Sequence, residues 1–183
     1  MTILSLLSRV KDRIHVSPHP CINEEEILRV SYLTGVAMLA HSDGEIDAEE
    51  EKLFLELSCV FDLGEKEALN LLKEARNPGE EVVWKIREHL LHSKYKYYFI
   101  LDLQIMAHQD KCIVPVEKAV LTRFCEILEI DEEDRRFLVG LADAVVEEDP
   151  VAKQEWAERF FTHLGDKKKV DLDYYTKSKT DEE

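Results

Sequence analysis

Six carboxylate side chains crowd into one short stretch of this 183-residue chain, between residues 43 and 51. They are Asp43, Glu45, Asp47, Glu49, Glu50 and Glu51. Oxygen ligands at this density suit Mg²⁺, Ca²⁺ or Mn²⁺ rather than zinc. Like charges within one turn repel each other, and a bound cation would offset that repulsion. The spacing predicts Asp43, Asp47 and Glu50 as the main ligands of a divalent cation, with Glu45 as a secondary ligand.

The same residues also have a purely structural interpretation. Asp47 and Glu50 have the spacing of a capping box, which satisfies the first backbone amides of a helix without any metal. Acidic residues in the first helical turn also suit the positive end of the helix dipole. An EF-hand is excluded, because its first and third ligand positions would be Leu39 and His41. The stretch is therefore either a cation site or a capped helix start.

A second, weaker copy of this turn occurs 67 residues further along the chain. The segment from Ala40 aligns without gaps on the segment from Ala107, and the apolar pattern stays in step over residues 40–63 and 107–130. The second copy keeps only Asp110 and Glu117 of the acidic set, which makes these two residues secondary candidate ligands. A duplicated helix–loop–helix unit predicts two turns related by a pseudo-twofold axis, with Asp43 and Asp110 able to approach each other.

The elements that position both turns are all predicted to be helices, because the apolar periodicity is helical nearly throughout. We expect an all-α, compact bundle of eight or nine short helices. The predicted spans are 2–14, 23–42, 48–61, 65–75, 80–92, 94–108, 115–128, 131–146 and 150–164. Residues 1–22 are assigned to an amphipathic helix and a Pro-containing connector, residues 23–164 to one domain, and residues 165–183 to a charged, flexible tail.

The turn that begins at Ala40 resembles the characteristic turn of the tellurite-resistance TerB family. In that family an apolar helix ends in A-x-x-D-G-x-I-x-x-x-E, which residues 40–50 match, and a second, degenerate turn corresponds to residues 107–117. The likeness covers roughly residues 24–164. It implies an all-α fold, a bacterial stress-response context, cation binding by the acidic turn and no established catalytic reaction. The chain departs from the family at Lys111, Cys112 and Val114, which argues against two equivalent sites.

The net charge of −15 argues against nucleic acid or an anionic membrane as the main partner, because a negative body repels phosphate. Residues 23–75 carry −10 of this charge, with 14 acidic and four basic side chains. No apolar stretch approaches the ~20 residues that span a bilayer, and no targeting signal is evident. Four cysteines without close pairing predict a reducing, cytoplasmic compartment. Residues 2–14 combine an apolar face with basic residues, so peripheral membrane contact or partner docking through this helix stays open.

Other candidate groups are interpreted as structural. His15, His19 and Cys21 lack a fourth zinc ligand, and residues 94–99 are read as a core anchor rather than a nucleic-acid platform. His41 and His108 are read as helix-end residues that contact carbonyl groups. No P-loop, nucleophile elbow or catalytic Cys–His signature occurs. The sequence therefore favours a non-enzymatic, TerB-like stress-response module that binds a divalent cation and a protein partner. The alternative is a metal-independent helical adaptor in which the acidic turn only caps helices, and the oligomeric state stays open.

Overall fold

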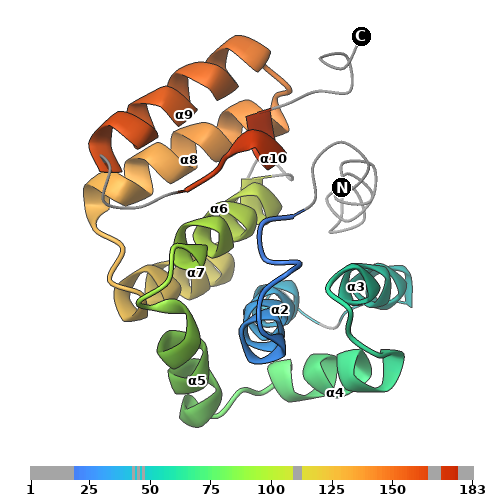
Figure 1. Cartoon of the computed structure of the whole chain (residues 1–183). Helices are drawn as coiled ribbons and strands as arrows, with labels where there is room; N and C mark the ends of the chain where they lie inside the picture. Colours follow the sequence, from blue (N-terminus) through green and yellow to red (C-terminus); the bar gives the residue numbers. More distant parts are fainter. Residues whose placement is uncertain are drawn as a thin grey trace, which may run out of the picture.

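The structure of the protein is a computed structural model that describes residues 19–42, 44, 46, 48–108, 113–164 and 170–176, without the side chains of Glu49, Glu50 and Leu53. Regular structure within these ranges is entirely helical (Figure 1), so the predicted all-α class is confirmed. The helices are α2 (Glu26–Ala40), α3 (Ala48–Val60), α4 (Glu65–Ala75), α5 (Glu80–Leu90), α6 (Tyr95–His108), α7 (Pro115–Ile127), α8 (Glu132–Val146), α9 (Pro150–Leu164) and α10 (Asp173–Thr176). Among the described residues, no helix has the length and apolar character that crossing a membrane requires. The helix predicted at residues 2–14 lies outside the described ranges.

The four helices α2 to α5 recur as α6 to α9 at the same offset of 67 residues that relates the two turns. Helices α3 and α7 coincide from end to end under this shift, and α4 and α8 begin at equivalent residues. The ends of α2 and α6 agree to within two residues. The repeat is therefore twice the length of the helix–loop–helix unit that the sequence predicts, and it accounts for all but the terminal segments of the described chain.

The C-terminal ends of α3 and α7 are built alike. Asp62 and Glu129 occupy equivalent positions, and both have a left-handed backbone, with φ of 55° and 51°. The next residue in each copy, Leu63 or Ile130, donates its N–H to the carbonyl five residues earlier at 2.9 Å. This is the closure of a Schellman motif, which satisfies carbonyls that the helix leaves unpaired. A non-glycine residue with positive φ at both positions shows that the two halves share backbone detail as well as helix order.

A basic side chain near the start of the first helix in each half fastens these helix ends. Arg29 of α2 donates to the backbone carbonyl of Phe61. Lys96 of α6, at the equivalent position, donates to the carbonyl of Leu128 at 2.9 Å and is only 8% exposed. A charge is tolerated at this depth because it bonds a carbonyl at the negative end of a helix. The first helix of each half is thereby fastened to the end of the second.

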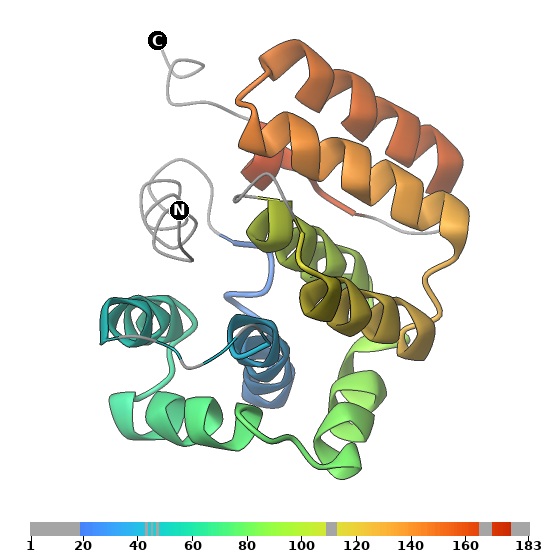
Figure 2. The ribbon, with the colours of Figure 1, turned by 180° about the vertical axis from the view of Figure 1, so that it is seen from behind.

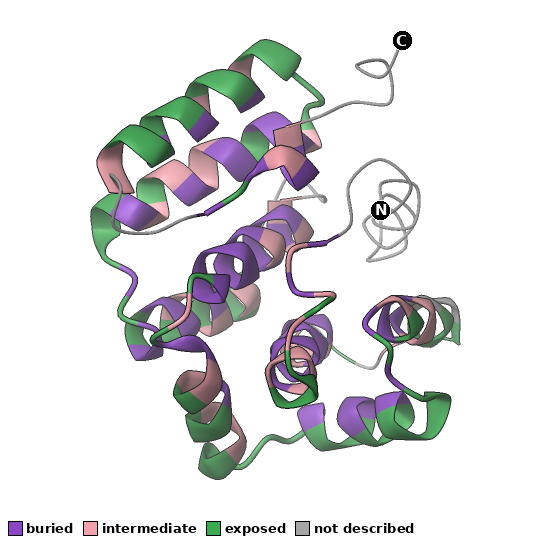
Figure 3. Ribbon diagram, viewed as in Figure 1, coloured by how far each residue is buried: buried purple, intermediate pink, exposed green. Residues whose placement is uncertain are grey.

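The core centres on the crossing of α2 and α6, around which the other helices are arranged (Figure 2). The buried residues concentrate along these two helices (Figure 3). The ring of Phe99 lies directly on Gly35, where an added Cβ would come within 2.3 Å of the ring. Only glycine permits this approach, so Gly35 is the position at which α2 and α6 pack closely. Residues 94–99 anchor the core as predicted, with Tyr95, Lys96, Tyr97, Tyr98 and Phe99 all buried.

The two halves differ in where their last helix packs. Helix α5 lies along α2 in the first half, whereas α9 lies along α8 in the second half (Figure 1). Gly140 of α8 permits this different packing. The ring of Trp156 in α9 lies so close to Gly140 that an added Cβ would be 2.4 Å from the ring. The face of α6 that corresponds to the α5-binding face of α2 is therefore left for another segment.

Residues 170–176 fill that place, and here the structure differs from the expected loose tail. Val170, Leu172, Tyr174 and Tyr175 are buried, and α10 packs against α9. Their alternating acidic neighbours hide this apolar content from a composition-based reading, which is why the sequence suggests a solvated tail. Residues 165–169 and 177–183 lie outside the described ranges.

The start of α2 and the position of Cys59 differ from what the sequence pattern suggests. Asn23 and Glu26 have the spacing of a capping box, but α2 begins at Glu26 with Glu25 as its N-cap and has no side-chain cap. Cys59 and Cys125 both lie in amphipathic helices, yet Cys125 is buried and Cys59 is exposed. Cys59 follows the buried Ser58 in α3 and therefore points away from the face that packs on the core.

Candidate functional site

The first acidic turn is only partly within the described residues. Asp43, Glu45 and Asp47 lie outside them, as does Asp110 of the second turn, and the side chain of Glu50 is not described. The predicted approach of Asp43 to Asp110 therefore also falls outside the described part of the chain. What the structure does place is the surroundings of the turn, namely its anchoring residues and the pocket beside it.

The turns are anchored by matching isoleucines. Ile46 in the first turn and Ile113 in the second are equivalent under the shift of 67 residues, and both pack, partly buried, against the core. The first turn is also joined to the end of α2, where the N–H of Gly44 donates to the carbonyl of His41 at 3.4 Å. An apolar residue in the middle of an acidic stretch thus fixes the loop to the bundle.

A pocket of about 230 Å³ adjoins the first turn, between it and α4. Ile46 and His41 line one side of it, and Glu51 also contributes to the wall. Lys73 of α4 and Arg76 at its C-cap line the same pocket as Glu51, so two positive side chains lie on the pocket that adjoins this stretch. Positive charge in this pocket reduces the repulsion among acidic residues that favours a bound cation.

His41 has one satisfied and one unsatisfied ring nitrogen. Its Nε2 lies 3.0 Å from the carbonyl of Leu72 in α4, which bears out the prediction that this histidine contacts a carbonyl at a helix end. Its Nδ1 is buried and has no hydrogen-bond partner among the described residues. When the ring donates through Nε2, Nδ1 keeps a lone pair that no described residue uses.

In the second turn, an acidic residue that both copies of the repeat contain acts as a helix cap. Glu117, the counterpart of Glu50, accepts a hydrogen bond from the backbone N–H of Val114 at 2.9 Å. This is the return half of a capping box, in which the third residue of a helix reaches back to its N-cap. His108, the counterpart of His41, bonds the carbonyl of Gln104 at 2.7 Å as predicted, and its Nε2 lies 3.4 Å from Asp143. Of the six predicted ligands, Glu117 is therefore the one whose described contacts favour the capping interpretation.

A buried polar cluster that the sequence does not indicate lies where α2, α6 and both terminal segments meet. Asp102 of α6 accepts hydrogen bonds from the hydroxyl of Tyr32 at 2.5 Å and from that of Tyr175 at 2.8 Å. His19 completes the set, with its Nε2 at 3.0 Å from the same carboxylate. The backbone N–H of Cys21 donates to Nδ1 of His19 at 3.2 Å, so the ring carries its hydrogen on Nε2 and donates to Asp102.

This cluster has a structural rather than a chemical character. Burial, together with the charge of Asp102, raises the pKa of Tyr32 and of Tyr175 well above the usual value for tyrosine. Burial likewise raises the pKa of the Cys21 thiol, so the thiol stays protonated and is a poor nucleophile. His19 is 2% exposed and its ring nitrogens are both engaged. Asp102 therefore serves as a common acceptor that joins four segments of the chain.

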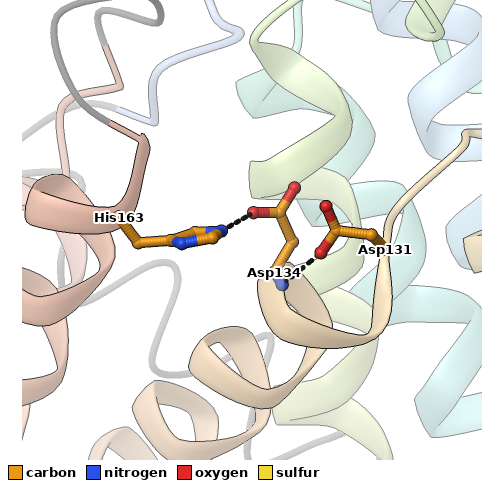
Figure 4. A group of neighbouring side chains, drawn as sticks. All are labelled: Asp131, Asp134 and His163. Carbon is orange, nitrogen blue, oxygen red and sulfur yellow. Dashed lines mark hydrogen bonds and ion pairs between the residues drawn. The ribbon is translucent and has the colours of Figure 1, made fainter.

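A third group has the spacing of a metal site. Ligand atoms of Asp131, Asp134 and His163 all lie within 4.8 Å of one another (Figure 4). Asp131 is the N-cap of α8, and its carboxylate accepts from the N–H of Asp134 at 2.7 Å. His163 of α9 lies 2.9 Å from the buried carboxylate of Asp134. Each member has a protein partner, so the arrangement is complete as a helix cap and a link between α8 and α9, although its donors also suit a divalent cation.

A wide groove of about 830 Å³ follows the outer side of the α8–α9 pair. Its aromatic floor consists of Phe137 and Trp156, and arginine side chains lie over both rings, Arg136 at 5.5 Å and Arg159 at 5.1 Å from the ring centroids. Both arginines also pair with glutamates on their own helices. The groove is thus aromatic and balanced in charge, unlike the strongly acidic first turn.

The chain matches no family model, no curated protein and no solved structure. Any assignment of function therefore depends on the geometry of these groups and on the resemblance of the turn sequence.

Proposed function

We propose that this protein is a non-enzymatic helical module of the TerB-like kind, that it acts by binding other proteins, and that it does so without a metal ion. The resemblance of its turn to the tellurite-resistance family supports a role in a bacterial stress response. In this account the acidic turn is a capped and charge-balanced helix start that presents a negative surface. The observation that carries it is the hydrogen bond from the Val114 N–H to Glu117, because Glu117 is the counterpart of the main predicted ligand Glu50.

The charges beside the first turn support the same proposal. Lys73 and Arg76 line the pocket that Ile46 borders, and they supply positive charge from the protein itself. If Asp47 and Glu50 form the capping box that their spacing predicts, the repulsion within the turn is offset from both sides, by backbone amides and by these two side chains. A cation is then not required for the turn to close.

A non-enzymatic role is supported by the state of the groups that resemble catalytic residues. In the His19–Asp102 pair, the histidine is buried, the carboxylate is partly buried, and both histidine nitrogens bond within the protein. Burial raises the pKa of Cys125 to about 11, so this thiol, like that of Cys21, is protonated at neutral pH. Neither cysteine thus supplies a thiolate, and the histidine lacks a free acceptor for a proton.

A second candidate function is cation binding at the first turn, with Asp43, Asp47 and Glu50 as main ligands and Glu45 and Asp110 as secondary ones. His41 favours it, because this residue lines the adjoining pocket and its buried Nδ1 has no hydrogen-bond partner among the described residues. Mg²⁺, Ca²⁺ and Mn²⁺ fit the oxygen-rich surroundings.

The double change Asp43→Asn with Glu50→Gln separates the two candidates. In the metal-independent account, the double variant loses some stability because a cap is weakened, and added Mg²⁺, Ca²⁺ or Mn²⁺ shifts the melting temperature of neither protein. In the cation account, each cation that binds raises the melting temperature of the wild-type chain in a saturable way, and the double variant loses that response. NaCl added to the same ionic strength, without a divalent cation, is the control for charge screening.

A further inference from the structure

The segment formed by residues 170–176 is held on α6 through a small number of specific contacts. The Tyr175 hydroxyl donates to Asp102, and the Tyr98 hydroxyl accepts the N–H of Asp171 at 2.5 Å. The Tyr174 ring meets the His19 ring edge-on, with centroids 5.0 Å apart. Val170 and Leu172 are buried beside these rings. The segment therefore makes its contacts through two of its own apolar side chains at alternate positions, followed by a pair of tyrosines.

Comparison of the two halves shows what kind of surface the segment covers. Ser31 of α2 bonds His89 of α5 at 2.6 Å, and the counterparts of these residues are Tyr98 and Trp156. Trp156 does not pair with Tyr98, because α9 packs against α8 and the Trp156 ring lies on Gly140. Tyr98 contacts the 170–176 segment in its place. The face of α6 is therefore built to receive a helix or peptide, and its occupant in this chain is a short terminal one.

A seven-residue segment that contains one short helix is easier to release than one of the long helices of the bundle. Helix α10 has four residues, so opening of the segment costs less than global unfolding. A tethered segment competes with any free peptide at an effective concentration in the millimolar range. The tether therefore hides the groove from ligands of similar intrinsic affinity unless the segment is released.

We propose that the surface formed by Tyr98 and Asp102 of α6 together with His19, which precedes α2, is a peptide-binding groove that residues 170–176 occupy as an intramolecular ligand. Its external ligand is a segment of a protein partner with the same chemistry, two apolar residues at alternate positions followed by two tyrosines whose hydroxyls reach the Asp102 carboxylate. The inference rests on the proposed function, since it names the surface through which a protein-binding module would act. It adds that the C-terminal segment regulates access to that surface.

The test uses a fluorescently labelled peptide of residues 168–178 and fluorescence anisotropy on full-length chains. The variant Leu172→Asp with Tyr175→Ser releases the chain's own segment and leaves the groove residues unchanged. We expect this variant to bind the peptide at least about tenfold more tightly than the wild-type chain, since the tethered competitor is gone. A peptide carrying the same two substitutions is the matched control and should not bind. Absence of binding to a variant that keeps its helical circular dichroism would overturn the proposal.

Hydrogen exchange on the wild-type chain keeps the proposal testable if that variant fails to fold. We expect the amides of residues 171–176 to exchange at least about a hundredfold faster than those in the middle of α6, because the segment opens locally. Exchange of both sets at one common, global rate would show that the segment is part of the core and not a ligand, and would contradict the proposal. Neither experiment depends on cations. A result that contradicts the groove can therefore be told apart from a result that contradicts the metal-independent proposal.

Discussion

The rings of Tyr32 and Phe99 contact each other edge-on at the centre of the molecule, with centroids 5.2 Å apart, and the two residues are equivalent under the repeat. A contact between equivalent residues is what a twofold relation produces. The neighbouring contacts are reciprocal as well, because Phe99 lies on Gly35 while Tyr32 bonds Asp102, the counterpart of Gly35. The two halves thus pack about a pseudo-twofold axis that passes between α2 and α6. A close-packed glycine, Gly35, lies on one side of this axis, and the partly buried carboxylate of Asp102 lies at the equivalent position on the other side.

Replacement of Gly35 tests the close packing at this axis. Gly35→Ala puts a Cβ against the fully buried ring of Phe99, which has no free space to move into. We expect a loss of about 2 kcal/mol in the free energy of unfolding, measured by urea denaturation. Gly140→Ala is the matched control, since the Trp156 ring it meets is only partly buried and can shift, while alanine gains helix propensity. Equal losses for the two variants would contradict the assigned packing.

Replacement of Asp102 tests the buried acceptor on the other side of the axis. Asp102→Asn removes one of the two oxygens that three donors share and turns an amide N–H₂ toward them. We expect a loss of about 3 kcal/mol in the free energy of unfolding, because a buried charged network is left partly unpaired. Asp143→Asn removes a half-exposed carboxylate that faces His108 and should change stability by less than about 0.5 kcal/mol. A neutral effect of Asp102→Asn would show that the cluster contributes nothing to folding.

The buried tyrosines predict sensitivity to alkaline pH. Burial raises the pKa of Tyr98 to about 12, and burial together with the nearby Asp102 raises the pKa of Tyr32 and of Tyr175 well above the usual value. Because the folded state resists ionisation of these groups, their contribution to stability is fully present below pH 10 and is lost as the pH rises from 10 towards 12. We expect tyrosinate absorbance at high pH to appear together with loss of helical circular dichroism. Non-cooperative ionisation near pH 10 in a protein that stays helical would contradict this burial.

The cap at the second turn has a measurable stability effect. Glu117→Ala removes the acceptor of the Val114 N–H and should cost about 1 kcal/mol, read from thermal or urea unfolding. Glu126→Ala is the control, since this residue lies exposed on the same helix and makes only an ion pair with Arg123. Its effect should stay below about 0.5 kcal/mol. If Glu117→Ala were no more costly than the control, the capping interpretation would lose its main support.

The helices could be predicted from the sequence because each carries its own periodic apolar face. Helix α4 matches its predicted bounds at both ends, and most of the other described helices differ from theirs by a few residues at most. The full extent of the repeat could not be predicted, because beyond the turns the two halves keep equivalent positions but not equivalent side chains. Arg29 and Lys96 illustrate this, since they make the same contact with a helix end through different groups.

The Asp102 cluster escaped prediction because its partners come from distant parts of the chain. Tyr32, Tyr175 and His19 are separated from Asp102 by 70, 73 and 83 residues. One signal was present, since Asp102 is the single acidic residue of the otherwise apolar helix α6, and such a residue needs a buried partner. The docking of residues 170–176 escaped prediction for a related reason. Its apolar residues alternate with charged ones, and only the surface left by α9 makes their burial possible.

The most direct test of the metal-independent account is a titration of the wild-type chain with Mg²⁺, Ca²⁺ and Mn²⁺, followed by amide NMR. The amides of Gly44 and Ile46 report on the first turn, and those of Asp131 and Asp134 report on the α8–α9 group as an internal comparison. The account predicts only the small, linear shifts that an equal ionic strength of NaCl also produces. A saturable shift or paramagnetic broadening at Gly44 and Ile46, absent from the Asp43→Asn, Glu50→Gln variant, would contradict it and establish a cation site at the first turn.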